Sequence, residues 1–313
     1  MKKILFVFSL TAILSSVYSQ NKTDSLGWHK DGFAGLNLNQ LSLTNWAEGG
    51  ESSLSATSLF NYVLKFKGRK TYWDNNLNLA YGLIKTEDED VRKNEDLIDF
   101  TSKYGRYAFG KFYYAGLLNF HTQFAPGYNY PNDTDVVSRF MAPGYLSVSL
   151  GLDWRPVDYF SLYFSPAAGK FTFVLDQDLA NVGAFGVDSA VRNSNGQITE
   201  EGKTVKFEFG ATLVATFRKE ILKNVELASK LTLFDDYTSK DPSNRKNVDV
   251  DWQTGFLMKV NDWITASILA HLIYDHNIPV PIYEKINGVK TQVGKGPRTQ
   301  FKEALAIGIS YKF

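Results

Sequence analysis

The feature that most constrains this chain is a two-residue alternation of apolar and polar side chains, repeated in long segments. It is clearest over residues 205–217, where Val205 and Phe207 alternate with Lys206 and Glu208. Successive residues of a β-strand point to opposite faces, so such a segment forms a strand with one apolar face and one polar face. Because the pattern recurs along the chain, we expect an all-β protein.

Many of these segments run to about 12–14 residues, whereas strands of soluble sheets average about 5–6. In the first segment Phe33, Leu36 and Leu38 do not share one phase with Leu41 and Leu43, which predicts a β-bulge there. We expect twelve strands, at residues 30–43, 53–66, 71–84, 97–107, 111–124, 144–154, 159–173, 204–218, 225–237, 247–260, 263–275 and 299–313.

The connections between these strands alternate strictly between short and long. This is the asymmetry of outer-membrane barrels, which have tight periplasmic turns and long external loops, so both termini are predicted to be periplasmic. The short connections are 67–70, 108–110, 155–158, 219–224 and 261–262. The long ones are 44–52, 85–96, 125–143, 174–203, 238–246 and 276–298.

The main alternative to a membrane barrel is a soluble β-sandwich, which also alternates. The chain has 23 Phe, 17 Tyr and 6 Trp with a mean hydropathy of −0.23, which suits an apolar exterior around a wet interior. A closed barrel also pairs every backbone group, as a bilayer requires. We therefore predict a single antiparallel transmembrane β-barrel of about 12 strands. Its aromatic girdle at the periplasmic side would comprise Trp73, Trp154, Tyr159, Trp263, Tyr311 and Phe313.

The N-terminus predicts export. Lys2 and Lys3 precede a short apolar run, and small residues lead to an expected cut between Ser19 and Gln20. The apolar run falls short of the roughly 20 residues that a membrane-spanning helix needs. We expect a signal peptide over residues 1–19 and the barrel over 20–313. The net charge of +1 gives no indication of a nucleic-acid partner, and no cysteine is present for a disulfide or a lipid anchor.

The chain's last residues, 309–313, resemble the C-terminal signal by which the barrel-assembly machinery recognises outer-membrane proteins, with Phe313 as the terminal aromatic. The chain also resembles a Bacteroidota outer-membrane family, domain of unknown function 3078. That resemblance implies the fold and the bacterial outer membrane, with outer-membrane lipid as surroundings, and implies no activity. It rests on residues 45–50, 73–75, 122–124, 165–166, 169–170 and 300–303.

The sequence offers no catalytic, cofactor or metal site. His121 and His271 fall on polar phases, but nothing places a third ligand beside them, so we expect solvated lumen histidines. Neither has the Ser two positions on that a resemblance to the twelve-stranded outer-membrane phospholipase would require. The acidic run 86–90 lacks the ligand order of a calcium loop. We therefore expect no enzyme.

The polar phases carry charges of both signs, which favour internal ion pairs over a single-sign selectivity ring. A barrel of twelve strands is intermediate in size between small barrels that side chains fill and large barrels that hold an open channel. The most favoured function is a narrow passive, porin-like channel or uptake barrel for a small polar solute. The alternative is a structural or surface-interaction barrel acting through loops 125–143, 174–203 and 276–298, and a lipid-modifying enzyme comes last. Candidate lumen-lining residues are Asp74, His121, Asp153, Lys206, Glu208, Lys230, Asp249, Asp251 and Lys302.

Overall fold

Twelve antiparallel strands close into one barrel, which confirms the predicted fold. The computed structural model describes residues 25–42, 52–86, 89–130, 132–239, 247–278, 280–286 and 289–313. Each barrel strand pairs with its neighbours along the chain, and the first pairs with the last. The strands are β1 (Gly27–Leu41), β2 (Ser53–Lys67), β3 (Thr71–Thr86), β4 (Arg92–Phe109), β5 (Phe112–Thr122), β8 (Gly144–Val157), β9 (Phe160–Phe173), β12 (Val205–Leu222), β13 (Val225–Asp236), β14 (Val248–Lys259), β15 (Ile264–Tyr274) and β18 (Gln300–Lys312).

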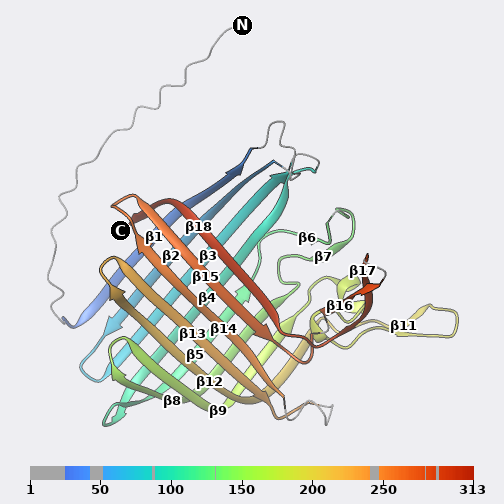
Figure 1. Ribbon diagram of the computed structural model, residues 1–313. Coiled ribbons are helices and arrows are strands. Elements are labelled where there is room, and N and C mark those ends of the chain that lie inside the picture. The colour runs from blue at the N-terminus through green and yellow to red at the C-terminus, as the bar shows by residue number, and fades with distance from the viewer. Residues whose placement is uncertain are drawn as a thin grey trace, which may run out of the picture.

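The short turns and the long loops lie at opposite ends of the barrel, as Figure 1 shows, with the C-terminus at the end of the short turns. Several strands are longer than the sequence predicted, including β4, β8 and β12, which each gain three residues or more. β4 begins at Arg92, and β12 continues to Leu222, so the connection to β13 shrinks to a two-residue turn with Asn224 at a φ of 64°. Which compartment each end faces stays a prediction.

The predicted bulge in the first strand is wrong. β1 pairs with β2 without a register shift over residues 27–41. The phase of the apolar residues changes because Phe33 and Leu36 lie on opposite faces of β1. The Phe33 ring lies over Gly35, and a β-carbon at position 35 would come within 2.9 Å of that ring. Register shifts lie instead at other strand pairs, including β9–β12 at Gly210, where a side chain would overlap the carbonyl oxygen of Asp235.

The two faces of the barrel wall differ as the alternation predicts. Large apolar side chains such as Phe207, Leu231 and Leu305 lie on the outer phase, and many of that phase are exposed. The six aromatic residues predicted for the girdle are all exposed near the turn end: Trp73, Trp154, Tyr159, Trp263, Tyr311 and Phe313. No helix among the described residues is long and apolar enough to cross a membrane.

The long loops carry structure that the alternation did not predict. They hold the hairpins β6 (Gly127–Tyr128) with β7 (Val136–Ser138), β10 (Val191–Arg192) with β11 (Ile198–Glu200), and β16 (Val280–Ile286) with β17 (Val289–Gly296). The segment between β9 and β12 also forms helices α1 (Gln177–Asn181) and η1 (Ala184–Gly186).

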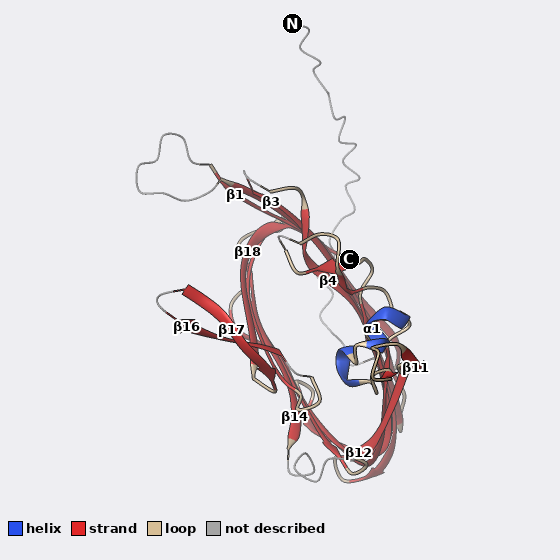
Figure 2. Cartoon of the chain, turned by 90° about the vertical axis from the view of Figure 1, so that its right-hand side faces the viewer, coloured by secondary structure: helices blue, strands red, loops and turns tan. Residues whose placement is uncertain are grey.

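The segment between β9 and β12 packs its own small apolar core at the loop end. That core comprises Ala142, Val174, Leu179, Ala180 and Val187. Viewed from the loop end, the barrel is an elongated ring, and the helical segment lies inside its outline (Figure 2). The loop 174–203 therefore covers part of the mouth.

Candidate functional site

A cluster of charged side chains lies inside the barrel near the short turns; we call it the turn-side cluster, with residues Tyr72, Asp74, Lys103, Asp153 and Arg155. Asp153 is fully buried at its centre. Its carboxylate accepts hydrogen bonds from Lys103 Nζ at 3.1 Å, from the Tyr72 hydroxyl at 2.5 Å and from Arg155 Nε at 2.6 Å. A buried carboxylate with three donors is satisfied, as a buried charge must be.

Arg155 joins two strands that are not neighbours. Its Nη2 donates to Asp74 on β3 at 2.6 Å, while Arg155 itself lies on β8, and β4 and β5 separate those strands. The guanidinium lies 3.4 Å from the centre of the Tyr72 ring, a cation–π contact. Gly105, opposite Tyr72 on β4, leaves room for that ring. Side chains of the turn-side cluster therefore reach across the interior.

A second cluster lies inside the barrel near the long loops; we call it the loop-side cluster, with residues Lys170, Lys206, Glu208, Asp249 and Asp275. Lys170 Nζ is 3.0 Å from both Asp249 and Asp275 and 3.8 Å from Glu208. Lys206 pairs with Glu208 at 2.8 Å. Since β12 and β13 separate β9 from β14, the Lys170–Asp249 contact also crosses the interior.

The carboxylates of the loop-side cluster surround a lysine. Among the described residues no group of three or more His, Cys, Asp and Glu is arranged to hold a metal ion. The ammonium of Lys170 itself lies among the three carboxylates of Glu208, Asp249 and Asp275.

The remaining predicted lumen residues form separate contacts. His121 is 3.6 Å from Asp99, and His271 is 3.2 Å from Asp251, so the two histidines have different partners. Lys302 on β18 contacts Glu95 on β4 at 2.7 Å, although β1, β2 and β3 lie between those strands. Lys230 on β13 interacts electrostatically with Asp99 on β4, so these distant strands also face each other.

The sequence predicted one partner of most of these ion pairs and missed the other. Asp74 and Asp153 were predicted, whereas Lys103 and Arg155 were not, because Lys103 lies in an irregular segment and Arg155 was assigned to a turn. Extending the polar phase of Asp153 by two residues would have found Arg155. Lys170 was missed although it lies opposite Glu208 in the register of β9 and β12, and its other two partners, Asp249 and Asp275, lie on distant segments.

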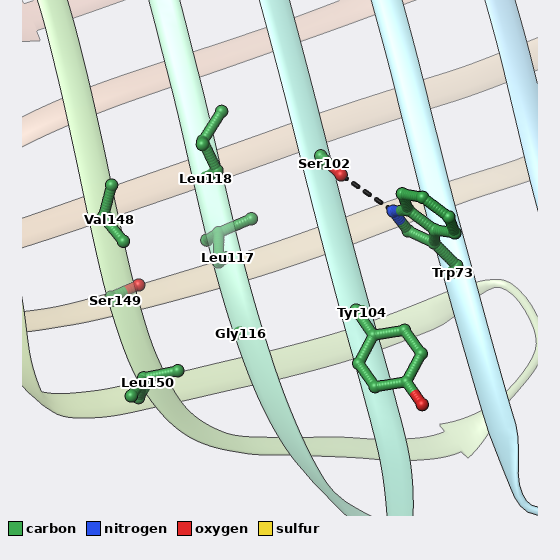
Figure 3. Close-up of a pocket in the computed structure, with 9 residues that line it drawn as sticks. All are labelled: Trp73, Ser102, Tyr104, Gly116, Leu117, Leu118, Val148, Ser149 and Leu150. Carbon is green, nitrogen blue, oxygen red and sulfur yellow. Dashed lines mark hydrogen bonds between the residues drawn. The ribbon is translucent and has the colours of Figure 1, made fainter.

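A hollow of about 450 Å³ lies on the outer surface between β4, β5 and β8 (Figure 3). The missing side chain of Gly116 opens it, and Tyr104, Val148 and Leu150 surround it. Trp73 Nε1 donates a hydrogen bond of 2.9 Å to Ser102 at its edge. Because the aromatic and aliphatic rim is exposed outward, this hollow belongs to the apolar exterior and takes no part in the interior clusters.

Residues 38–128 match a family described as "Protein of unknown function (DUF3078)". That range is less than a third of the chain, and it contains the first three stretches that carry the resemblance, at residues 45–50, 73–75 and 122–124. No functionally curated protein matches the sequence. The match supports the predicted family over this part of the chain and assigns no activity.

Several solved outer-membrane barrels resemble the structure weakly. A COG4313 outer membrane channel from Pseudomonas putida F1 is 10% identical, with 96% of this chain and 100% of that chain covered and a TM-score of 0.39. The translocator domain of the autotransporter NalP from Neisseria meningitidis is 13% identical, covering 93% and 90%, with a TM-score of 0.30. The toluene transporter TodX from Pseudomonas putida is 8% identical, covering 93% and 89%, with a TM-score of 0.28. Scores this low carry no inference about what this chain binds or transports.

Proposed function

We propose that this chain is an outer-membrane barrel that gives small polar solutes a narrow passive route across the bilayer. The observation that carries the proposal is an interior lined by charged, mutually paired side chains inside an apolar outer wall. Charged groups facing the interior need water or partners, and here pairing across non-adjacent strands leaves a narrow wet path.

The charges of the two clusters suggest the selectivity of this path. The turn-side cluster is neutral, since Lys103 and Arg155 balance Asp74 and Asp153. The loop-side cluster carries two lysines and three carboxylates, 2 − 3 = −1. A single excess negative charge favours cations only weakly. We therefore propose a constricted channel with low selectivity.

Several sequence expectations belong to this proposal. Export would remove residues 1–19, and Phe313 would present the C-terminus to the barrel-assembly machinery. The end with short turns would face the periplasm, and the segment 174–203 would cover part of the external mouth. The chain is proposed to need no cofactor and to catalyse no reaction.

The test is conductance of the purified barrel in planar bilayers, with liposome swelling for uncharged solutes. Small, steady conductance steps support the channel, and a silent barrel that admits no solute contradicts it. In the variant Lys170→Gln the net charge of the loop-side cluster changes from −1 to −2. The reversal potential in a salt gradient therefore shifts toward the equilibrium potential of the cation. The control Lys219→Gln, on the outer face of β12 beside Tyr159, leaves the reversal potential unchanged.

A surface-interaction role is the second candidate, and the built structure of segment 174–203 favours it. The hairpin of β10 and β11 exposes Val191 and Ile198 at its surface. If the loop binds a partner, Val191→Ser with Ile198→Ser abolishes binding to whole cells while conductance is retained. Unchanged binding would contradict this second role.

A further inference from the structure

The seam that closes the barrel is paired over only part of its length. β1 pairs with β18 over residues 33–37 and 308–312. On their other edges the same strands pair much further, β1 with β2 over residues 27–41 and β18 with β15 from residue 300 onward. Both strands of the seam therefore continue toward the long loops, past the point where their pairing stops.

Exposure along the unpaired stretch confirms that the two edges stand apart. All residues of 38–40 and of 301–305 are exposed, including those whose side chains point inward. The inward-facing Asn39, Lys302 and Ala304 are among the exposed residues. A strand paired on both edges would shield its inner face, as β13 does. In the part of the chain that the structure describes, no ladder pair joins residues 38–41 to 300–307.

The gap lies at the depth of the apolar belt. On the outer face of β18, Leu305 and Ile307 lie between the aromatic residues Phe301 and Tyr311, all of them exposed. Unpaired backbone groups are costly in hydrocarbon and are tolerated where they line a water-filled cavity. An opening between the interior and the surrounding lipid satisfies this condition, because water from the interior can reach the free edges.

The two sides of the gap have opposite chemistry. Leu36, Leu38, Leu305 and Ile307 form an apolar outer border. On the inner side Lys302 contacts Glu95 of β4, and this ion pair lies behind the gap because β4 is on the far side of β1, β2 and β3. A molecule lying across the gap would meet hydrocarbon-like groups at one end and charges at the other.

We propose that the unpaired seam is a lateral opening that admits an amphipathic molecule with an acyl chain from the membrane. Its chain lies against the apolar border and its polar head reaches the Lys302–Glu95 pair. The proposal rests on the membrane placement given under the proposed function and is independent of conductance.

The geometry of the seam can be tested with disulfides, because the chain has no cysteine. If the register continued, Leu38 would lie opposite Ile307, so Leu38→Cys with Ile307→Cys probes the gap. The control, Ala34→Cys with Tyr311→Cys, probes a true register pair of the same outward phase. In lipid vesicles under mild oxidation the control links to completion, and the gap pair does not, because bridging needs close α-carbons. Equally fast linking of both pairs overturns the opening.

The occupant can be tested with a photoactivatable fatty acid in phosphatidylcholine vesicles that contain the folded protein. Adducts are expected on inward-facing positions 302–306 of β18 and not on Ala228, which faces inward from the fully paired β13. Lys302→Gln should lower the adduct yield, since the carboxylate head loses its cation.

Two outcomes overturn the assignment of an acyl amphiphile: inward positions of β18 free of adducts, or a stable dimer cross-linked along β18, which would mean that a second copy covers the edge. Conductance of the same vesicles separates the two proposals. A silent barrel with adducts rejects the channel and keeps the opening, and a conducting barrel without adducts does the reverse.

Discussion

The wall formed by β8, β9 and β12 and the seam between β1 and β18 show two ways of holding a barrel together. In the wall, Asp153, Tyr163 and Ser165 are fully buried, and side chains bond across strands inside the barrel. At the seam, a short ladder joins the strands, and the inward-facing Lys302 and Ala304 are exposed. The comparison teaches that closure of the backbone ladder and filling of the interior are separate sources of stability in one fold.

The largest effect is expected when the wall loses its central carboxylate. Asp153→Asn leaves Lys103 buried without its carboxylate partner and leaves Arg155 paired with Asp74 alone. Breaking a buried pair by removing one partner typically costs about 3–5 kcal/mol. Urea titration of the barrel folded into vesicles should show this loss. The exposed control Lys203→Gln should change the midpoint little, and equal midpoints for both variants would mean that the wall is not held by this network.

A charge placed on the outer face should distinguish the wall side from the seam. Leu231→Arg lies outward in the middle of the fully paired β13, where Arg at the midplane costs about 2–4 kcal/mol. Leu305→Arg should cost less, because its guanidinium can reach water and Glu95 through the gap. Vesicle folding titrations compare the two, and equal costs would argue for a closed seam.

Position 210, next to the register shift between β9 and β12, should tolerate no side chain. Gly210→Ala would overlap the carbonyl oxygen of Asp235, and forcing extra volume into a packed site costs about 1–3 kcal/mol. Gly255→Ala is the matched control, because its β-carbon would lie 3.4 Å from the nearest atom, an ordinary contact. Thermal unfolding in detergent measures both, and a stable Gly210→Ala barrel would show that β13 can move away from position 210.

The smallest effect is a difference in hydrogen exchange that leaves the protein unchanged. Backbone amides of residues 301–307 that point toward β1 should exchange quickly in detergent, while those of residues 308–312 are protected by the ladder. Exchange followed by mass spectrometry reports this. Uniform protection along β18 would remove the contrast between seam and wall.

Sequence reasoning found the strands because alternation is local. The opposite faces of Val205 and Lys206 can be predicted from the sequence alone, and all twelve predicted strands have a counterpart in the structure. The same reasoning failed for Phe33, whose inward position depends on the absent side chain of Gly35. The short loop hairpins were missed because β10 and β11 are too brief to show a period.

The interior clusters were only half predictable, for a related reason. The polar phase identified Asp74 and Asp249, but which cations meet them depends on how strands three places apart curve toward each other. Lys170 is the clearest case, since its partner Asp275 lies on a segment that follows β15. The incomplete seam also had no local signal, because pairing between the two ends of the chain is the least local contact in the fold.

The central claim is that successive residues of each strand face lipid and water in turn. Single cysteines at each position of 205–217, in a chain that has no other cysteine, can carry a nitroxide label in lipid vesicles. Accessibility to oxygen should peak at Phe207 and Phe209, and accessibility to a water-soluble nickel reagent at Lys206 and Glu208, with a period of two. A flat profile, or a protein that stays soluble without detergent, would contradict it.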